Sequence, residues 1–542
     1  MPDQTKLALA DFQSGNPDSA LQKLQKTLSK KPENAFAWFL SAIIHTQQSD
    51  FHTAITEFKN ALKYQPVYPE ALNNMGVALE ATENKTQAAD VYEKAIKQKK
   101  DYANAYYNLA NIQKNDNDFT NAIENYLLAI KYKPDYSNAM NNLALIYKNM
   151  GNYNKSETLL KQALKLSKND LEIENNLGHT YFLLHQYDKA INIFQGVLEK
   201  SPDYAPTILN YGLLLRAMGS LDKASINFNK LSENLLFQKQ AMNNLAHLEL
   251  SICNFKDGWE HYRYRPSMRD SQLQTLDSLP GELQGSSILL YKDQGIGDEI
   301  FFSRYIPELK KLGAQLNYVT DSKLGDLWKH NLSNINIITT TPVIGEFDHV
   351  ISIGDLPRLL YKNGCTDIPP PIALFPKPEA IEKIKNFLPH NGKSNIAVTW
   401  EAGVQGENSL FKLIPPNLLG KSLSSIDANI LILQRNPKSK DIKSLEKSLG
   451  RKSFNLAFAN DNLEEMLALL SLVDEYVCVS NTNTHLISAL NRPCHVLIPH
   501  PPEWRWLNAG DQSPWFPKAI LYRQDPSGSW DESMNRLQAN IL

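Results

Sequence analysis

The chain has 542 residues, a length that corresponds to three or four compact domains rather than to one small core. Its apolar fraction of 42% and charged fraction of 21% are typical of globular proteins, and a net charge of −2 gives no bulk attraction to nucleic acid or to an anionic membrane. No apolar run is long enough to span a bilayer and no secretory signal precedes the first helix, so we expect a cytoplasmic protein. The four cysteines lack C-x-x-C spacing, and we expect buried thiols.

A repeat of 34 residues runs through the first half of the chain. A small residue recurs at this interval, and a large apolar or aromatic residue follows it after four positions. The small residues are Ala20, Ala54, Ala88, Ala122, Ser156, Ala190, Ala224 and Gly258. Prolines in the same phase end the second helix of several units, so the pattern predicts stacked helical hairpins.

The repeat resembles the tetratricopeptide repeat and predicts an α-solenoid over residues 1–265, with seven full units and a divergent eighth. Such an array has a concave face that commonly binds another protein. Asparagine occupies one position in units three to eight: Asn74, Asn108, Asn142, Asn176, Asn210 and Asn244. Because an amide side chain both donates and accepts hydrogen bonds, we expect this column either to hold the main chain of an acceptor peptide or to bond local backbone groups.

The periodicity changes after a polar connector at residues 266–286. Short β-rich segments then alternate with helical segments, which predicts parallel sheets with crossover helices. Strands are expected at residues 288–292, 315–319, 335–339, 349–353, 396–400, 430–434, 476–480 and 495–499. A proline-rich segment divides them, so we expect two Rossmann-like domains, residues 287–378 and 379–542, that face a cleft. The fold class is therefore an α-solenoid followed by an α/β region.

One loop of this half, DQGIGDEIFF, joins a predicted strand to a helix, where open α/β sheets bind ligands. Gly295 and Gly297 allow a ligand to approach the backbone closely, and Asp298 begins the helix. Ile300 stands where a dinucleotide fingerprint requires a third glycine, which argues against nicotinamide binding. Asp298 either complements the helix dipole or is a catalytic base for an acceptor hydroxyl.

A second loop opens a helix with small polar residues and a histidine: Ser480, Asn481, Thr482, Asn483, Thr484 and His485. Free amides at a helix N-terminus bind phosphate, so this loop predicts a site for a nucleotide-activated donor. His485 either contacts that donor or packs inside the helix. We expect Lys412 and Gln434 to face the same edge, where Lys412 either neutralises phosphate or is a solvated surface lysine. No segment has P-loop spacing, which removes the main support for phosphoryl transfer from ATP.

The segments GIGDEIFFSRYIPEL, SNTNTHLISALNRPCHVLIPHPPEWRW and SPWFPKAILYRQ resemble the tetratricopeptide-containing bacterial glycosyltransferases, whose catalytic half is similar to heptosyltransferases and has the GT-B fold. The resemblance extends over most of residues 243–542. It implies that Asp298 is the base and that no divalent metal or other cofactor is required, with the leaving-group charge stabilised by amides and Lys412. Two departures leave the donor sugar open: Ser480 and Asn481 replace the usual Asp-Thr, and Glu401 replaces an arginine.

The SNTNTHL and PPEWRW segments are similar to those of flagellin-modifying members, in which the repeats hold flagellin and a CMP-activated nonulosonic acid is the donor. The sequence therefore predicts a protein O-glycosyltransferase that transfers a sugar from a nucleotide-sugar to Ser or Thr of a protein in the groove of the repeats, with flagellin as the implied acceptor. Two alternatives remain, a non-catalytic adaptor with a vestigial glycosyltransferase domain and a heptosyltransferase-like enzyme with a glycan or lipid acceptor. Inverting and retaining chemistry are both open.

Overall fold

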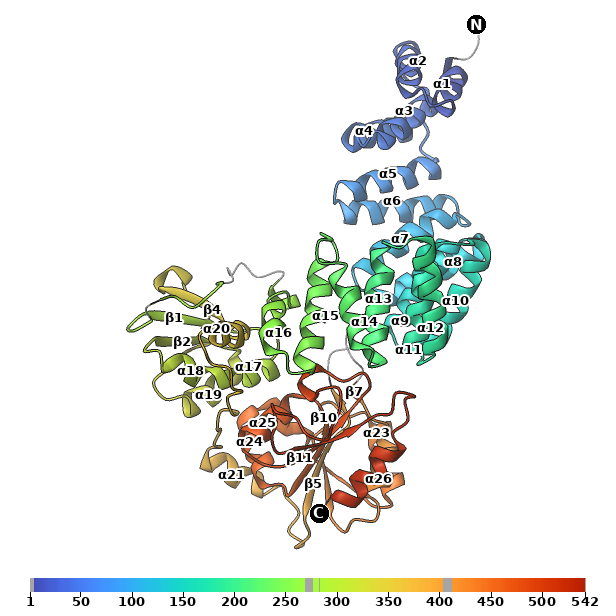
Figure 1. The fold of residues 1–542 in the computed structure, drawn as a ribbon. Coiled ribbons are helices and arrows are strands. Elements are labelled where there is room, and N and C mark those ends of the chain that lie inside the picture. The colour runs from blue at the N-terminus through green and yellow to red at the C-terminus, as the bar shows by residue number, and fades with distance from the viewer. Residues whose placement is uncertain (1–3, 269–275, 282, 403–411, 542) are drawn as a thin grey trace. The chain divides into compact units, whose positions relative to one another are not determined.

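The computed structural model describes residues 4–268, 276–281, 283–402 and 412–541. Its chain forms two compact units, residues 1–193 and 194–542 (Figure 1). Helix pairs joined by short turns make up the first unit. Its helices are α1 (Gln4–Gln13), α2 (Pro17–Lys30), α3 (Ala35–Gln47), α4 (Phe51–Tyr64), α5 (Pro69–Ala81), α6 (Lys85–Gln98), α7 (Ala103–Asn115), α8 (Phe119–Tyr132), α9 (Ser137–Asn149), α10 (Tyr153–Leu166), α11 (Leu171–Leu183) and α12 (Tyr187–Lys200), which continues into the second unit.

The small and large residues of the repeat meet inside each helix pair. Ala88 in α6 is fully buried, and four residues later Tyr92 lies against Gly76 in α5. A Cβ atom on Gly76 would lie 2.4 Å from Tyr92 Cε1, so a larger residue at this position would force the ring to shift. The residues that repeat every 34 positions are therefore those that pack the two helices of a pair closely together. Packing of this kind between neighbouring helices stabilises a solenoid.

The helix pairs continue into the second unit, where they adjoin the sheets. The last two pairs are α13 (Ala205–Ala217) with α14 (Leu221–Asn229) and α15 (Gln238–Ser251) with α16 (Phe255–Tyr262). Eight pairs are thus present along the described part of the chain, up to Tyr262. The solenoid predicted from the repeat is confirmed, while the compact units divide within α12.

A four-stranded sheet follows the last repeat. Its strands are β1 (Ser287–Tyr291), β2 (Gln315–Val319), β3 (Asn336–Ile338) and β4 (His349–Ser352), in the order β3-β2-β1-β4, and every pairing is parallel. Its helices are α17 (Ile296–Phe302), α18 (Ile306–Lys310), α19 (Ser322–Asn331) and α20 (Leu356–Lys362). The central strand β1 is fully buried at Ile288, Leu289 and Leu290, as a parallel strand covered on both faces requires.

A six-stranded sheet forms the rest of the unit. Its strands are β5 (Asn395–Thr399), β8 (Asn429–Ile432), β9 (Phe454–Asn455), β10 (Glu475–Val479), β11 (Cys494–Ile498) and β12 (Ala519–Arg523), all parallel in the order β12-β11-β10-β5-β8-β9. Its helices are α21 (Pro378–Lys385), α22 (Pro416–Leu423), α23 (Ser439–Leu449), α24 (Leu463–Leu472), α25 (Thr482–Ala489) and α26 (Asp531–Asn540). The strands β6 (Glu401–Ala402) and β7 (Lys412–Leu413) form a separate two-stranded antiparallel sheet. The eight predicted strands are confirmed, whereas β6, β7, β9 and β12 were not predicted.

One hydrophobic core joins the last helix pair to both sheets. Trp259 of α16 packs edge-on against Trp504 and Trp515, with ring centroids 5.5 and 5.8 Å apart. Phe301 of α17 packs on the same two tryptophans, at 5.5 Å from each. Aromatic contacts of this kind add about 0.5–1.5 kcal/mol each beyond the area they bury. The core therefore fixes α16 against segments that lead from both sheets.

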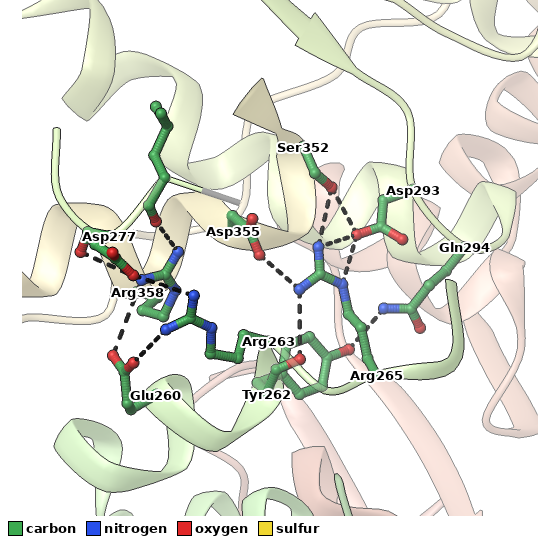
Figure 2. Close-up of polar contacts among 11 residues, drawn as sticks. Glu260, Tyr262, Arg263, Arg265, Asp277, Asp293, Gln294, Ser352, Asp355 and Arg358 are labelled. Atoms are coloured by element: carbon green, nitrogen blue, oxygen red, sulfur yellow. Dashed lines mark hydrogen bonds and ion pairs between the residues drawn. The ribbon is translucent and has the colours of Figure 1, made fainter. Parts of the chain in front are cut away.

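A buried charge cluster links the chain after α16 to the first sheet, as Figure 2 shows. Arg265, which follows α16 and is 1% exposed, donates from Nε to Asp293 Oδ2 at 2.6 Å and from Nη1 to Asp355 Oδ1 at 2.6 Å. Ser352 Oγ accepts from Arg265 Nη2 at 3.0 Å and donates to Asp293 Oδ2 at 2.7 Å. The aspartates follow β1 and β4, so the cluster ties the end of the repeats to the carboxyl edge of the first sheet.

Two expectations from composition have separate outcomes. Cys478 and Cys494 are buried free thiols, but Cys253 is exposed and Cys365 is partly exposed, so the expectation of buried thiols is wrong for these two residues. Among the described residues, no helix combines the length and the apolar character that a membrane span requires.

Candidate functional site

The two loops expected to carry chemistry lie in contact, although they belong to different sheets. The glycine-rich loop leads from β1 into α17, and the polar loop leads from β10 into α25. A Cβ atom on Gly297 would lie 3.4 Å from His485 Nε2 and 3.6 Å from Thr482 Oγ1. The missing side chain of Gly297 therefore lets the two loops approach each other, and we call this contact the loop junction.

Asp298 is bound at the loop junction by an arginine that the sequence analysis did not identify. Its Oδ1 atom lies 2.5 Å from Arg505 Nη2, and its Oδ2 atom accepts a hydrogen bond from the amide of Gly295 at 3.4 Å. The second contact matches the helix-terminus role expected for Asp298, while its role as a base stays a prediction. The signal for Arg505 was available in PPEWRW, where one arginine stands between two tryptophans that are buried in the fold.

Lys412 forms an ion pair instead of pointing into solvent. Its Nζ atom lies 2.7 Å from Glu503 Oε1, and Ser480 Oγ donates to Glu503 Oε2 at 2.9 Å. Burial would raise the pKa of Glu503, but Lys412 and Arg505 together lower this pKa to about 2. The alternative of a solvated surface lysine is therefore wrong, and the charge of Lys412 is shared with a carboxylate that holds the polar loop.

The polar loop uses part of its hydrogen-bonding capacity to cap its own helix. Asn481 Oδ1 accepts from the amide of Thr484 at 3.0 Å, and Thr484 Oγ1 accepts from the amide of Asn481 at 3.2 Å. This capping box occupies two of the amides expected to bind phosphate, so the amides left for a ligand are those of Thr482 and Asn483. Asn481 and Thr482 are partly exposed, whereas four residues of the loop are buried: Ser480, Asn483, Thr484 and His485.

His485 is a packed, neutral imidazole beside the loop junction. Its ring centroid lies 5.9 Å from that of Phe301 and 5.3 Å from that of Phe516. Burial lowers the pKa of His485 well below its usual range, and the positive charges of Arg505 and Arg304 lower it further. The packing alternative is thus present in the structure. Contact of His485 with a donor stays a prediction.

Gln434 has a structural role that the sequence analysis did not foresee. Its Oε1 atom accepts from the amides of Trp400 at 3.1 Å and Glu401 at 2.9 Å, and its Nε2 atom donates to Glu401 O at 3.0 Å. The side chain is 6% exposed, so its amide is occupied in joining the ends of β8 and β5. The expectation that Gln434 binds a donor is therefore corrected, because burial and these bonds turn the side chain inward.

The asparagine column forms bonds between consecutive repeats. Three of its members donate from Nδ2 to an asparagine of the preceding repeat, and two donate to a carbonyl within their own helix. The bonds are Asn108 to Asn73 Oδ1 (3.1 Å), Asn142 to Asn111 Oδ1 (2.9 Å), Asn176 to Asn141 Oδ1 (3.0 Å), Asn74 to Glu70 O (2.8 Å) and Asn244 to Gln240 O (2.9 Å). Asn210 occupies the equivalent position in α13. The local alternative is confirmed for the last two bonds, and peptide binding by the column stays a prediction.

A cavity of about 1010 Å³ opens at the carboxyl edge of the second sheet. Its lining combines the end of α13 with the segments that follow β11 and β12, including Arg216, Asn508 and Gln524. The repeats and the sheet are also linked directly, since Asn508 Nδ2 donates to Ser251 Oγ of α15 at 2.7 Å. The sequence analysis identified no residue of this cavity, because its walls come from segments almost 300 positions apart in the chain.

These features define a protein with tetratricopeptide repeats followed by a region of parallel sheets. Residues 5–51, 44–103, 103–136 and 135–200 match family models for the tetratricopeptide repeat. The chain is similar to a curated protein, Protein FlbA of Caulobacter vibrioides, with 21% identity over 375 residues. This match covers 63% of the chain and 62% of FlbA, so the chain spans less than two thirds of the length of that relative.

Solved structures with similar helix arrays match the chain over part of its length. The crystal structure of MamA has 24% identity and a TM-score of 0.28, and it covers 30% of this chain and 94% of its own. A tetratricopeptide repeat protein from Parabacteroides merdae has 17% identity and a TM-score of 0.36, with coverage of 44% and 95%.

Proposed function

We propose that the chain is a protein O-glycosyltransferase of the GT-B type, which transfers a sugar from a nucleotide-activated donor to Ser or Thr of a protein acceptor. The observation that carries this proposal is the loop junction. It brings the loop that carries Asp298, from the first sheet, next to the N-terminus of α25, from the second sheet. A base on one domain and an anion-binding helix end on the other are the parts that sugar transfer requires.

In this mechanism Asp298 takes the proton of the acceptor hydroxyl, and the amides of Thr482 and Asn483 stabilise the leaving phosphate. Lys412 adds positive charge at the same edge, held in place by Glu503 at 2.7 Å. These groups are fixed before the reaction, so their dipoles and charges need little reorganisation as the leaving group becomes anionic. A CMP-activated nonulosonic acid is the donor and flagellin is the acceptor that we propose to test first.

The cavity beside α13 supports the acceptor half of the proposal. It lies at the carboxyl edge of the second sheet, where open α/β sheets bind ligands, and the seventh repeat supplies Arg216 to its wall. An acceptor segment bound at the end of α13 would lie beside this edge. The tetratricopeptide repeats are a common scaffold for such protein binding.

One observation favours the alternative of a non-catalytic adaptor. Asp298 is paired with Arg505 at 2.5 Å, and Lys412 is paired with Glu503, so both groups assigned to chemistry are neutralised in this structure. An adaptor predicts tight binding of the acceptor protein with no turnover of any donor.

The test combines binding and transfer in one series. Purified chain is incubated with flagellin and candidate nucleotide-sugars, CMP-nonulosonic acids first, and flagellin is weighed by intact-mass spectrometry. We expect a mass increase equal to the transferred sugar residue. Asp298→Asn should abolish this increase and leave flagellin binding intact, whereas Asp326→Asn, which changes an 85% exposed carboxylate on α19, should transfer normally. Binding of flagellin without any mass increase, across all donors, would establish the adaptor instead.

A further inference from the structure

Arg505 is the least satisfied charged side chain at the loop junction. It is 9% exposed, and its guanidinium carbon lies 4.5 Å from the ring centroids of both Phe301 and Trp504. Its Nη2 atom contacts Asp298, but its buried Nε atom has no hydrogen-bond partner among the described residues. A buried N–H group without a partner carries a desolvation cost, so the site around Arg505 is incomplete in this structure.

A second buried arginine, Arg304, lies beside Arg505. Burial lowers the pKa of Arg304 to about 10, and this side chain is 2% exposed and donates to the carbonyl oxygens of Phe301 and Trp515 at 2.9 and 3.0 Å. Arg304 and Arg505 lie on the same ring of Phe301, at 4.3 and 4.5 Å from its centroid.

The carboxylates paired at the loop junction are fewer than the cations. Lys412 adds a third cation, while the carboxylates paired with these cations in the described structure are Asp298 and Glu503. Glu299 follows Asp298, but it accepts hydrogen bonds from Tyr318 and Thr320, and burial raises its pKa. Arg304, Arg505 and Lys412 thus face two paired carboxylates, and the buried Nε atom of Arg505 is left without a partner among the described residues, an arrangement that a bound anion stabilises.

We propose that Arg505 binds the anionic group of the donor, and that Asp298 occupies the position of this group while the donor is absent. An arriving oxyanion takes over the guanidinium of Arg505 and releases the carboxylate of Asp298, so the base becomes free only when the donor is bound. This inference rests on the proposed function and deepens it. The step exchanges one ion pair for another and involves no covalent change.

The chemistry of the ligand follows from the guanidinium. Its planar fork of N–H groups matches an anion that presents two neighbouring oxygens, such as a carboxylate or a phosphate. In a nucleotide-activated nonulosonic acid, this anion is either the carboxylate of the sugar or the phosphate of the nucleotide. The similar glycosyltransferases often have an arginine at the position of Glu401. In this chain, Arg505 supplies a positive charge that Glu401 does not.

Isothermal titration calorimetry of the full chain with CMP, UDP and free N-acetylneuraminic acid tests this assignment. We expect Arg505→Gln to weaken binding of at least one probe about tenfold, because a charge-assisted hydrogen bond is lost. Asp298→Asn should strengthen binding of the same probe several-fold, because the guanidinium no longer has a competing carboxylate. Arg263→Gln, which removes a partly exposed arginine elsewhere in the unit, should bind like the wild type.

The opposite changes in the two variants separate recognition from a structural role. If Arg505→Gln does not fold, Asp298→Asn alone tests the proposal. Weaker or unchanged binding in Asp298→Asn then overturns the proposed exchange of Asp298 for the donor anion on Arg505. A response limited to N-acetylneuraminic acid identifies the sugar carboxylate as the ligand of Arg505, and a response limited to the nucleotides identifies the phosphate. Binding that neither variant alters refutes the assignment of Arg505 alone. If the wild type binds none of the three probes, both the donor site and the proposed function are refuted.

Discussion

Arg265 Nη1 and Asp355 Oδ1 lie 2.6 Å apart in the interior of the second unit. The arginine follows the last helix of the repeats, and the aspartate follows β4 of the first sheet. Asp293 is the second carboxylate partner, at 2.6 Å from Nε (Figure 2). Since all three groups are at least 95% buried, this cluster holds the repeat end in a fixed position against the strand ends that carry the Asp298 loop.

Replacing Arg265 by methionine should destabilise the second unit strongly. Two carboxylates would remain buried without a cation, a loss that typically costs about 3–5 kcal/mol. Urea denaturation followed by circular dichroism measures the change in the free energy of unfolding. The matched control is Arg263→Met, which breaks pairs with Glu260 and the 85% exposed Asp277 and should cost about 1 kcal/mol or less. Equal losses in the two variants would contradict the importance assigned to the buried cluster.

Asn176→Ala should loosen the contact between two consecutive repeats. The bond from Asn176 Nδ2 to Asn141 Oδ1 joins α11 to α9, and both side chains are buried, so its loss leaves an unsatisfied acceptor at a cost of about 1–2 kcal/mol. Hydrogen exchange followed by mass spectrometry should show about five- to thirtyfold faster exchange in α9 and α11. Asn154→Ala, which changes an exposed residue of α10, should exchange like the wild type.

Acidification should destabilise the chain through His247. Burial first, and then the charge of Arg216, lowers the pKa of His247 to about 3. Below pH of about 6.5, the unfolded state therefore binds a proton that the folded state does not, and the stability falls as the pH decreases. From pH 7 to pH 5, the wild type should lose about 2 kcal/mol more than His247→Gln, as measured by urea denaturation at each pH.

His261 supplies the opposite sign in the same measurement. Its hydrogen bond with Glu249 raises the pKa of His261 in the folded state. Its contribution to stability is therefore complete below the unfolded pKa of about 6.5 and is lost as the pH rises through the folded pKa. His261→Gln should lower stability at pH 5.5 and have a smaller effect at pH 9. The same direction of pH dependence for both histidines would reject these assignments.

Gly297→Ala should impair transfer by separating the two loops. The new Cβ atom would lie 3.2 Å from His485 Cδ2, so the imidazole or the glycine-rich loop must shift by a few tenths of an ångström. Misplacement of a catalytic loop reduces rates steeply, and we expect kcat/KM for transfer to fall about tenfold. Gly345→Ala, where a Cβ atom meets open space, should retain wild-type transfer. An unchanged rate in Gly297→Ala would show that the loop junction is not required.

The repeats and most of the strands could be predicted from the amino-acid sequence alone. Helix pairing in a solenoid depends on neighbours within about 34 residues, so small and large residues at a fixed interval are sufficient to predict it. Buried parallel strands are likewise visible as apolar runs, which located eight of the strands. The edge strand β12 was not identified, and β6, β7 and β9 have only two residues each, too few to form an apolar run.

Which charges and amides are available to a ligand depends on contacts that form only in the folded chain. Gln434, Lys412 and the amides of the polar loop were assigned to a ligand from their residue types, but their partners come from β6, Glu503 and the helix cap. Arg505 and Asp298 are 207 positions apart and meet only because two sheets pack on one aromatic core. Ion pairs and desolvation depend on distances of a few ångströms between such remote segments, and a residue's type does not contain that information.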